Sequence, residues 1–362
     1  MAVVTFPHLG VYTPAFTWLL TQLGNTVITP QPPGKQTLTL GAVHGPEFAC
    51  IPLKMCLGTF IEGLDQGADT IVTSGGVGPC RAGLYGTVQR EILRSLGYKF
   101  DMIVLEPFRR HPVSLLRSVH KLNAAGLSPL RLLQTARQCW AMIKACDVLE
   151  HALLKLRPRE VEVGSAERVF QRGLKKIFAA HNTAEIDQTT QAVLAEMQRV
   201  PIDPNRDPVR VGIVGEIYVL LEPEANLHIE RILGEYGAEV HRAIFLTGWT
   251  EENVIREGDN ETARQAAAPY LDEMIGGHGQ DTVGHTVLYA KEGVDGVIQL
   301  APFTCIPEIV ARAVLPSVSN DHDIPVISFF LDEQTGEAGY RTRLEAFVDL
   351  LTRRRDKRRK AS

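Results

Sequence analysis

Long hydrophobic runs are missing from this sequence. No stretch of about 18 apolar residues occurs, so we expect no transmembrane helix. The first ten residues form a short apolar stretch without a basic flank, which is not typical of a signal peptide. We therefore expect a cytoplasmic protein.

Cysteine is sparse, and two common motifs are absent. Six cysteines in 362 residues are too few for a disulfide scaffold, which the cytosol would also disfavour. No CxxC pair, the spacing common in structural zinc sites, is present. A GxxxxGK[ST] phosphate loop is missing as well, so we do not expect this chain to hydrolyse ATP itself.

The remaining composition is that of an ordinary globular protein. With 44% hydrophobic and 22% charged residues, disorder, collagen and coiled coil are excluded as descriptions of the whole chain. At roughly 150 residues per domain, the length predicts two domains.

The net charge of −4 hides an uneven distribution. Residues 109–160 hold ten Lys/Arg and three Asp/Glu, a net charge of +7. Residues 353–360 hold seven Lys/Arg and one Asp, a net charge of +6, so the rest of the chain has a net charge of −17. The basic segments are either solvated helix faces or surfaces for phosphates or an acidic partner. Nucleic acid is disfavoured as that partner because no recognition motif accompanies the charge.

Alternating short apolar segments and helical patterns predict two α/β lobes. Strands are expected over residues 3–6, 26–28, 69–74 and 100–105, and again over residues 209–214, 238–246, 296–301 and 325–331. Helical patterns between them are typical of parallel sheets covered by helices. From about residue 112 to residue 199 the strands disappear, and PIDPNRDP after them has the composition of a linker. We divide the chain into an N-terminal lobe (1–111), a basic helical insert (112–200), a linker (201–208), a C-terminal lobe (209–352) and a basic tail (353–362).

Three of the cysteines occupy similar positions. Cys80 and Cys305 each follow a predicted strand and open a helix, and Cys50 lies just before Pro52 at another helix start. In parallel sheets, ligands bind at the edge that the carboxyl ends of the strands form. A helix N-terminus also lowers the pKa of a thiol and favours anionic ligands. The positions therefore allow three thiolates to converge in a cleft between the lobes.

Convergent thiolates indicate zinc or an iron–sulfur cluster. A cubane cluster takes four ligands when closed, so three protein thiolates leave one iron open to substrate or solvent. From spacing alone, the alternative that each cysteine is a small buried hydrophobic residue stays open. Core packing is expected for Cys56, about 240° around a helix from Cys50, and for Cys139 and Cys146, which share an apolar face.

Several local strings resemble those of one protein family. They lie at residues 49–54 (ACIPLK), 78–81 (GPCR), 214–218 (VGEIY), 302–308 (PFTCIPE), 332–333 (DE) and 342–347 (TRLEAF). Taken together, they resemble the iron–sulfur component of the 2-hydroxyacyl-CoA dehydratases and the acyl-CoA dehydratase activase-related (CoA protein activase) proteins. The resemblance covers most of the chain, and the activase-related branch is the more similar one.

The resemblance implies a fold, a cofactor and partners. It implies two Rossmann-like parallel-sheet lobes with a helical insert between them, and a [4Fe–4S] cluster held by Cys50, Cys80 and Cys305. In the dehydratases, an ATP-hydrolysing activator with its own cluster injects one electron, which makes a ketyl radical of the acyl-CoA thioester before water leaves. For this chain the resemblance implies such an activator, an acyl-CoA as a possible substrate, and a homodimer or a heterodimer with a related subunit.

The expected function is a lyase or an ATP-driven reductase component, and three alternatives to it remain open. The chain is a non-catalytic accessory or electron-relay protein, or a zinc protein of the same lobed fold. A reductase with a larger double-cubane cluster is the third, for which only Cys56, Cys139 and Cys146 could supply additional ligands.

Five residues near the cysteines are candidates for binding. Gly75, Gly76 and Gly78 either let the backbone approach the cluster or form only a strand-to-helix turn. Lys54 and Arg81 either balance cluster charge and bind a substrate anion or are solvated surface residues.

Carboxylates and histidines supply the acid–base candidates. Glu216 lies at a strand end facing the expected cleft, and Glu308 lies in the first turn of a helix, where an acid is favourable in any case. His8 follows the first strand and could face the same cleft. His278 and His285 are expected at the surface.

Overall fold

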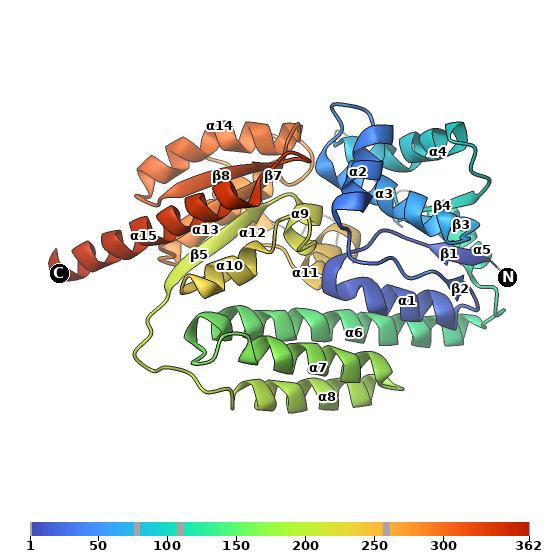
Figure 1. The fold of residues 1–362 in the computed structure, drawn as a ribbon, viewed down its shortest axis with the longest axis horizontal. Helices are drawn as coiled ribbons and strands as arrows, with labels where there is room; N and C mark the ends of the chain where they lie inside the picture. Colours follow the sequence, from blue (N-terminus) through green and yellow to red (C-terminus); the bar gives the residue numbers. More distant parts are fainter. Residues whose placement is uncertain (1, 76–79, 107–111, 256–260, 362) are drawn as a thin grey trace.

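Two parallel-sheet lobes lie side by side over a helical layer (Figure 1). This computed structural model describes residues 2–75, 80–106, 112–255 and 261–361. The predicted fold class, Rossmann-like α/β lobes with a helical segment between them in the sequence, is confirmed. Among the described residues, no helix combines the length and the apolar character needed to cross a membrane.

The N-terminal lobe is built on a four-stranded parallel sheet. Its strand order is β2-β1-β3-β4, with β1 (Val3–Thr5), β2 (Thr26–Val27), β3 (Thr70–Ser74) and β4 (Asp101–Leu105). Its helical elements are η1 (Gly10–Tyr12), α1 (Thr13–Gln22), α2 (Lys35–His44), α3 (Ile51–Asp65), η2 (Arg81–Leu84), α4 (Tyr85–Ser95) and α5 (Pro112–Leu122).

The C-terminal lobe repeats the same sheet. Its order is β6-β5-β7-β8, with β5 (Val209–Gly215), β6 (Ala238–Arg242), β7 (Gly296–Pro302) and β8 (Val326–Leu331). Its helical elements are α9 (Ile217–Leu221), α10 (Ile229–Glu235), α11 (Leu246–Thr250), η4 (Glu251–Ile255), α12 (Glu261–Ala267), α13 (Gly279–Lys291), α14 (Ile306–Asp321) and α15 (Glu337–Ala361). Strands β3 and β7 are therefore equivalent, and so are β1 and β5.

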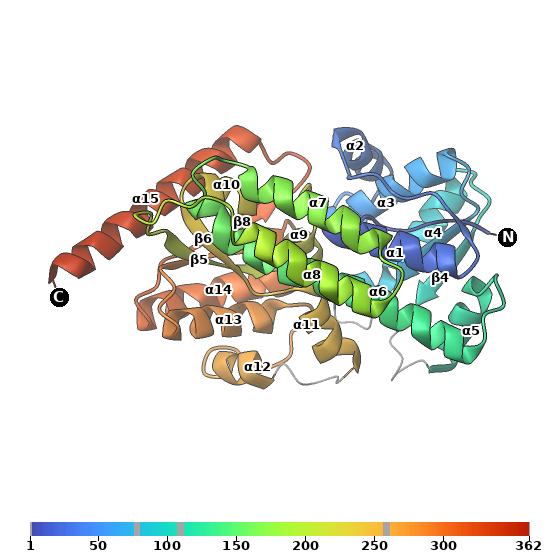
Figure 2. The same ribbon diagram turned by 90° about the horizontal axis from the view of Figure 1, so that it is seen from below.

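The insert lies against both lobes as a layer of helices (Figure 2). It comprises α6 (Pro129–Leu156), η3 (Arg157–Arg159), α7 (Ser165–Ala179) and α8 (Thr183–Met197). Helix α6 contacts α1 of the first lobe and β6 and α11 of the second. Asp147 on α6 joins all three parts, because it accepts hydrogen bonds from the Tyr12 hydroxyl (2.6 Å) and the Thr247 backbone N–H (3.0 Å).

Helix α2 is the largest element that the sequence pattern does not predict. It packs closely on α3, because a Cβ on Gly41 would lie only 1.7 Å from the backbone oxygen of Lys54. Residues 243–246 of the predicted strand 238–246 lie outside β6. Helix α5, assigned to the insert by sequence, contacts β4 of the first lobe.

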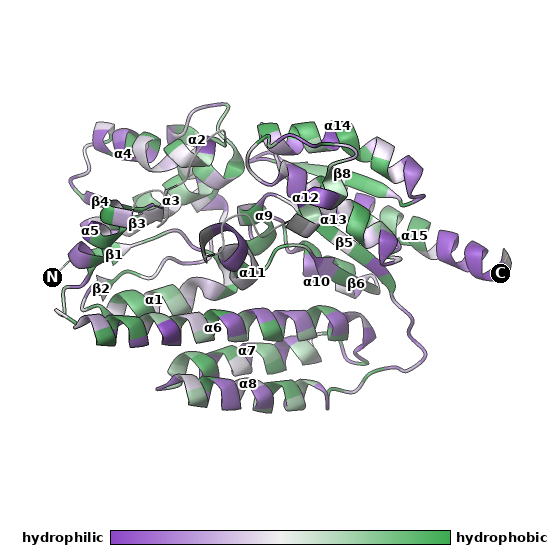
Figure 3. Ribbon diagram, turned by 180° about the vertical axis from the view of Figure 1, so that it is seen from behind, coloured by the Kyte–Doolittle hydropathy of each residue, from purple (hydrophilic) through white to green (hydrophobic). Residues whose placement is uncertain are grey.

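The basic tail is the C-terminal end of α15. Its far end is hydrophilic (Figure 3) and remains helical through residue 361. Arg354 and Arg358 bind Asp323, while Arg355 and Arg359 lie near Asp207. Four arginines of the tail are thus paired with carboxylates of the C-terminal lobe and the linker.

Candidate functional site

Each of the three predicted cysteines stands at the N-cap of a helix. Cys50 precedes α3, Cys80 precedes η2 and Cys305 precedes α14. The equivalence of β3 and β7 gives Cys80 and Cys305 corresponding places, each a few residues beyond the carboxyl end of its strand. The predicted helix starts are therefore confirmed.

Arg81 ties the three cysteine-bearing segments together. Its guanidinium donates to the backbone oxygen of Phe48 (2.9 Å), two residues before Cys50, and to that of Thr304 (2.5 Å), directly before Cys305. The Thr304 hydroxyl also donates to the Phe48 oxygen (3.0 Å). Because Arg81 itself follows Cys80, these bonds bring all three segments to one place between the lobes.

Burial has the largest effect on the pKa values of these three thiols. The pKa values of Cys50, Cys80 and Cys305 are raised above that of an ordinary thiol, first by desolvation and further by the Glu216 carboxylate. The backbone N–H groups of the first helical turns lower these pKa values, as expected, but they only partly oppose the rise that burial causes. Without a bound cation the thiols are protonated, and a metal or cluster must displace those protons.

Tyr85 is a site residue that sequence reasoning missed. Its hydroxyl forms a short hydrogen bond with the Cys50 sulfur, and burial raises its pKa far above the usual value. Tyr85 opens α4, five residues after Cys80, so it belongs to the same strand-to-helix connection. No motif in the sequence distinguishes it from an ordinary core tyrosine.

The donor set of the predicted cluster is three thiols on separate segments. No three His, Cys, Asp or Glu side chains of the described residues lie close enough together to hold a single metal ion. In a cubane each thiolate binds a different iron, so its ligands are more widely spaced than those of one ion. Arg81 holds the segments of the three thiols together, and the cluster itself stays a prediction.

Glu308 is buried in the C-terminal lobe behind Cys305. Its side chain is fully enclosed and accepts hydrogen bonds from the Thr282 hydroxyl (3.1 Å) and the Gln299 amide (2.8 Å). Desolvation raises its pKa to about 7. A carboxyl group with that pKa can both give and take a proton near neutral pH.

Glu216 and His278 lie in the same electrostatic neighbourhood. Glu216 caps α9, accepting from the Val219 backbone N–H (3.0 Å), and burial raises its pKa. His278 interacts with both Glu216 and Glu308, and Asp281 holds the His278 pKa above its ordinary value against desolvation.

The predicted surface position of His278 and His285 is wrong. Only 11% of the His278 side chain is exposed, and burial lowers the pKa of His285. Gly277, directly before His278, packs against the cysteine site, because a Cβ there would lie 3.0 Å from Pro307 and 3.9 Å from the Cys80 sulfur.

Lys54 connects the two lobes. It is 3% exposed, and its ammonium pairs with the Glu333 carboxylate at 2.7 Å. Its charge is therefore compensated by the C-terminal lobe, and its predicted role toward an anion stays a prediction. Both partners belong to strings that carry the family resemblance.

The glycine candidates are only partly described. Gly75 directly follows β3. A Cβ there would lie 2.5 Å from the Glu106 carboxylate, so a side chain at this position would displace that group. Gly76 and Gly78 lie outside the described residues.

The other three cysteines are buried. Cys139 and Cys146 lie in the hydrophobic core between α6 and α1, in agreement with the packing prediction. Cys56 is enclosed near Tyr218, and desolvation raises its pKa to about 12. Cys56 also interacts electrostatically with Cys50, so it lies behind the three-cysteine site.

Comparisons with known proteins add no assignment. No protein-family model matches this sequence, and no curated protein is significantly similar to it.

Proposed function

We propose that this chain is an iron–sulfur protein in which Cys50, Cys80 and Cys305 bind one [4Fe–4S] cluster. The observation that carries the proposal is the junction made by Arg81, which hydrogen-bonds the segments leading to Cys50 and Cys305 while standing next to Cys80. The same three cysteines lie in strings that resemble the 2-hydroxyacyl-CoA dehydratase component.

The cluster would supply an electron at low potential to a substrate, for which the resemblance implies a CoA thioester. This chain's own residues then have distinct tasks. Arg81 fixes the cysteine segments and adds a positive charge beside them. The Tyr85 hydroxyl holds the Cys50 sulfur by a hydrogen bond, and Glu308 is the enclosed group able to exchange a proton near neutral pH.

A set of exposed apolar residues, here called the apolar collar, flanks the three cysteines in the sequence. It consists of Phe48 (69% exposed), Leu84 (63%), Phe303 (54%), Ile306 (60%) and Ile309 (47%). The collar residues flank the three cysteines in sequence, and the Arg81 bonds hold their segments together. Exposed apolar side chains that gather near one site favour a protein interaction there. We assign it to the ATP-hydrolysing activator, which must approach the cluster to deliver an electron.

Loss of the collar is expected to weaken activator binding without affecting the cluster. Phe48→Ser combined with Ile306→Ser removes two large apolar anchors, and loss of about 1.4 kcal/mol or more predicts at least a tenfold higher Kd. Binding is measured by anaerobic interferometry with the activator, beside the iron content of each variant. Leu130→Ser with Leu350→Ser is the matched control, because both leucines are exposed but lie on α6 and α15. Equal binding by the collar variant and the control would contradict the assignment.

Metal analysis tests the proposed function directly. Protein prepared or reconstituted under strict anaerobiosis should be brown, hold about four irons and four sulfides per chain, and give an EPR signal on reduction. A colourless preparation that cannot be reconstituted refutes the proposal, and stoichiometric zinc in its place identifies the zinc alternative. If the cluster is present but no acyl-CoA is turned over with the activator, the collar favours the electron-relay role.

A further inference from the structure

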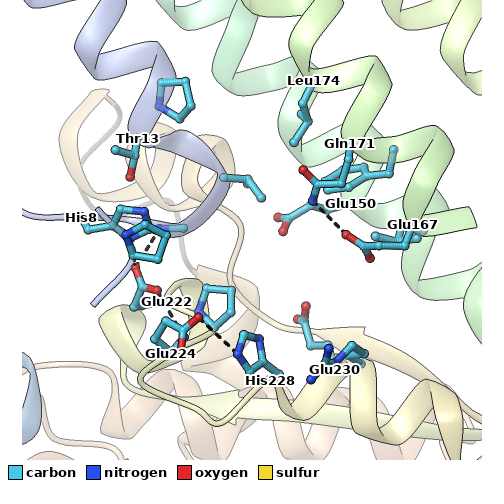
Figure 4. A pocket seen from close by; sticks show the side chains of 18 of the residues that line it. His8, Thr13, Glu150, Glu167, Gln171, Leu174, Glu222, Glu224, His228 and Glu230 are labelled. Carbon is cyan, nitrogen blue, oxygen red and sulfur yellow. Dashed lines mark hydrogen bonds and ion pairs between the residues drawn. The ribbon is translucent and has the colours of Figure 1, made fainter. Parts of the chain in front are cut away.

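Charged groups inside the molecule and on its surface differ in how they are compensated. In the cavity of about 680 Å³ between the insert and the two lobes, His8 lies 2.6 Å from Glu222, and His228 lies 3.2 Å from Glu224 (Figure 4). On the outside of α5 and of the first turns of α6, several cations have no such partners. The proposed electron-transfer function does not use this outer surface.

The positive charge comes from an acid-free stretch of the sequence. Residues 107–146 contain seven Lys/Arg and no Asp or Glu. Four of these cations are exposed on α5 and the first turns of α6: Arg117, Lys121, Arg131 and Arg137. Lys121 pairs with Asp101 at 3.2 Å, whereas the three arginines form no ion pair with any residue that the structure describes. The surface therefore carries uncompensated positive charge.

Large aliphatic side chains are exposed among these cations. They are Val113 (65% exposed), Leu116 (63%), Leu130 (66%) and Leu133 (48%). On α5, the spacing of Val113, Leu116 and Arg117 is that of residues on one helix face. The two exposed leucines of α6 share a face with Arg137 in the same way. Each helix thus presents aliphatic and cationic side chains together.

The exposed faces of the two helices belong to one region of the molecule. Both helices pack on the same hydrophobic cluster, to which α5 contributes Leu122 and α6 contributes Leu132. Asn123 closes the connection between them, because its side-chain amide donates to the backbone oxygen of Leu127 (2.9 Å) and accepts from its N–H (2.8 Å). Figure 2 shows α5 next to the start of α6 at one end of the molecule. We call the four aliphatic residues and the four cations the basic–apolar surface.

The composition of the basic–apolar surface favours a lipid partner. Protein interfaces rely on aromatic anchors, which this surface lacks, and leucine and valine are under-represented among their dominant residues. Nucleic acid would pair with the cations but leave the aliphatic side chains in water. A second copy related by a twofold axis would bring like charges together. Anionic lipid headgroups, in contrast, attract Lys and Arg, while the boundary with the acyl chains takes up leucine side chains.

We propose that the basic–apolar surface binds reversibly to the surface of an anionic phospholipid membrane. Arg117, Arg131 and Arg137 would contact lipid phosphates, and the neighbouring leucines would enter the boundary between headgroups and acyl chains. Because the binding combines charge attraction with apolar burial, removal of either is expected to weaken it. The contact uses neither the three cysteines nor the apolar collar, so it is independent of the proposed function.

Sedimentation with vesicles tests the proposal on the intact chain. Vesicles of phosphatidylglycerol and phosphatidylcholine in equal parts are compared with vesicles of phosphatidylcholine alone, at about 0.1 M and about 0.5 M NaCl. We expect binding to the anionic vesicles at the lower salt concentration, and at least about tenfold weaker binding at the higher one or to the neutral vesicles. No binding to the anionic vesicles at low salt, or equal binding to the neutral ones, overturns the proposal.

Two pairs of substitutions locate the contact. Arg117→Gln with Arg131→Gln removes two cations and should weaken binding to the anionic vesicles about thirtyfold. Leu116→Ser with Leu130→Ser removes two apolar side chains and should weaken that binding at least about tenfold. If the leucine pair binds as well as the natural chain, the leucines do not enter the lipid and the proposal fails.

Matched controls change similar residues elsewhere. Arg353→Gln with Lys357→Gln removes two exposed cations of α15, and Val161→Ser with Val163→Ser removes two exposed valines before α7. Both controls should bind vesicles as the natural chain does, and thermal melts show whether each variant is folded. Loss of binding in the α15 pair but not in the Arg117 pair would assign the contact to the basic tail and refute the proposal. Capture of poly-glutamate without vesicle binding would refute it too, and would identify an acidic protein as the partner.

Discussion

Replacing Cys305 by serine is expected to abolish cluster binding. The substitution removes one of three thiolates and puts in its place a hydroxyl that ionises far less readily, at a buried position where Glu216 and Glu308 already disfavour another negative charge. Iron content should fall from about four to less than about one per chain, and the EPR signal of the reduced protein should disappear. Iron and sulfide analysis after anaerobic reconstitution measures this directly.

Cys139→Ser is the matched control for that experiment. Cys139 is also buried, at 4% exposure, but it lies on α6 and donates only to the Ala15 backbone oxygen at 3.6 Å. The Cys139→Ser control should keep its full iron content and lose a little stability. The Cys305→Ser variant should lose its iron, but without the cluster it should melt at nearly the same temperature as the natural chain without the cluster. Full iron in the Cys305→Ser variant would contradict the ligand assignment.

The sequence predicts the position of each cysteine in its own segment but not how the segments meet. A proline two residues after Cys50 and after Cys305 marks a helix start, and the strand before Cys305 is plain from its β-branched residues. The junction depends on Arg81 reaching a backbone oxygen 223 residues away. Backbone acceptors carry no residue-type signal, so such contacts cannot be found by motif.

Burial is the second quantity that local patterns do not determine. His278 follows two glycines and has the sequence surroundings of an exposed loop, yet only 11% of its side chain is exposed. The pKa values of the thiols depend on the same enclosure, which outweighs the effect of the helix N-termini. Lys54 similarly has an ordinary helical context, and its partner Glu333 comes from the other lobe.

The identical strand order of the two sheets could be anticipated only in part. Alternating strands and helices predict parallel pairing, but they do not tell which strands are neighbours. The observed orders β2-β1-β3-β4 and β6-β5-β7-β8 place the segments after β1 and β5 at equivalent points. His8 and Glu222, which form a buried hydrogen bond of 2.6 Å between the two lobes, come from those two segments.

A buried guanidinium, that of Arg242, connects the insert to the C-terminal lobe. Its side chain is 3% exposed, binds Glu150 of α6 and Glu230 of α10, and stacks 4.1 Å from the centre of the Phe245 ring. Breaking a buried ion pair by removing one partner is costly because the remaining charge has lost its compensation. Here two carboxylates would be left together in a poorly hydrated position.

Arg242→Met is therefore expected to lower the free energy of unfolding by about 3–5 kcal/mol at pH 8. Burial already raises the pKa of Glu230, and loss of the guanidinium raises it further, so the folded variant binds more protons than its unfolded chain above pH 4.5. The deficit relative to the natural protein should thus shrink as the pH falls from 8 toward 5. Urea unfolding at several pH values measures both effects. Arg341→Met, which removes a partly exposed arginine paired with Glu337, should cost less than about 1 kcal/mol at any of them. A deficit for Arg242→Met that is small, or that grows on acidification, would show that the buried carboxylates do not depend on this arginine.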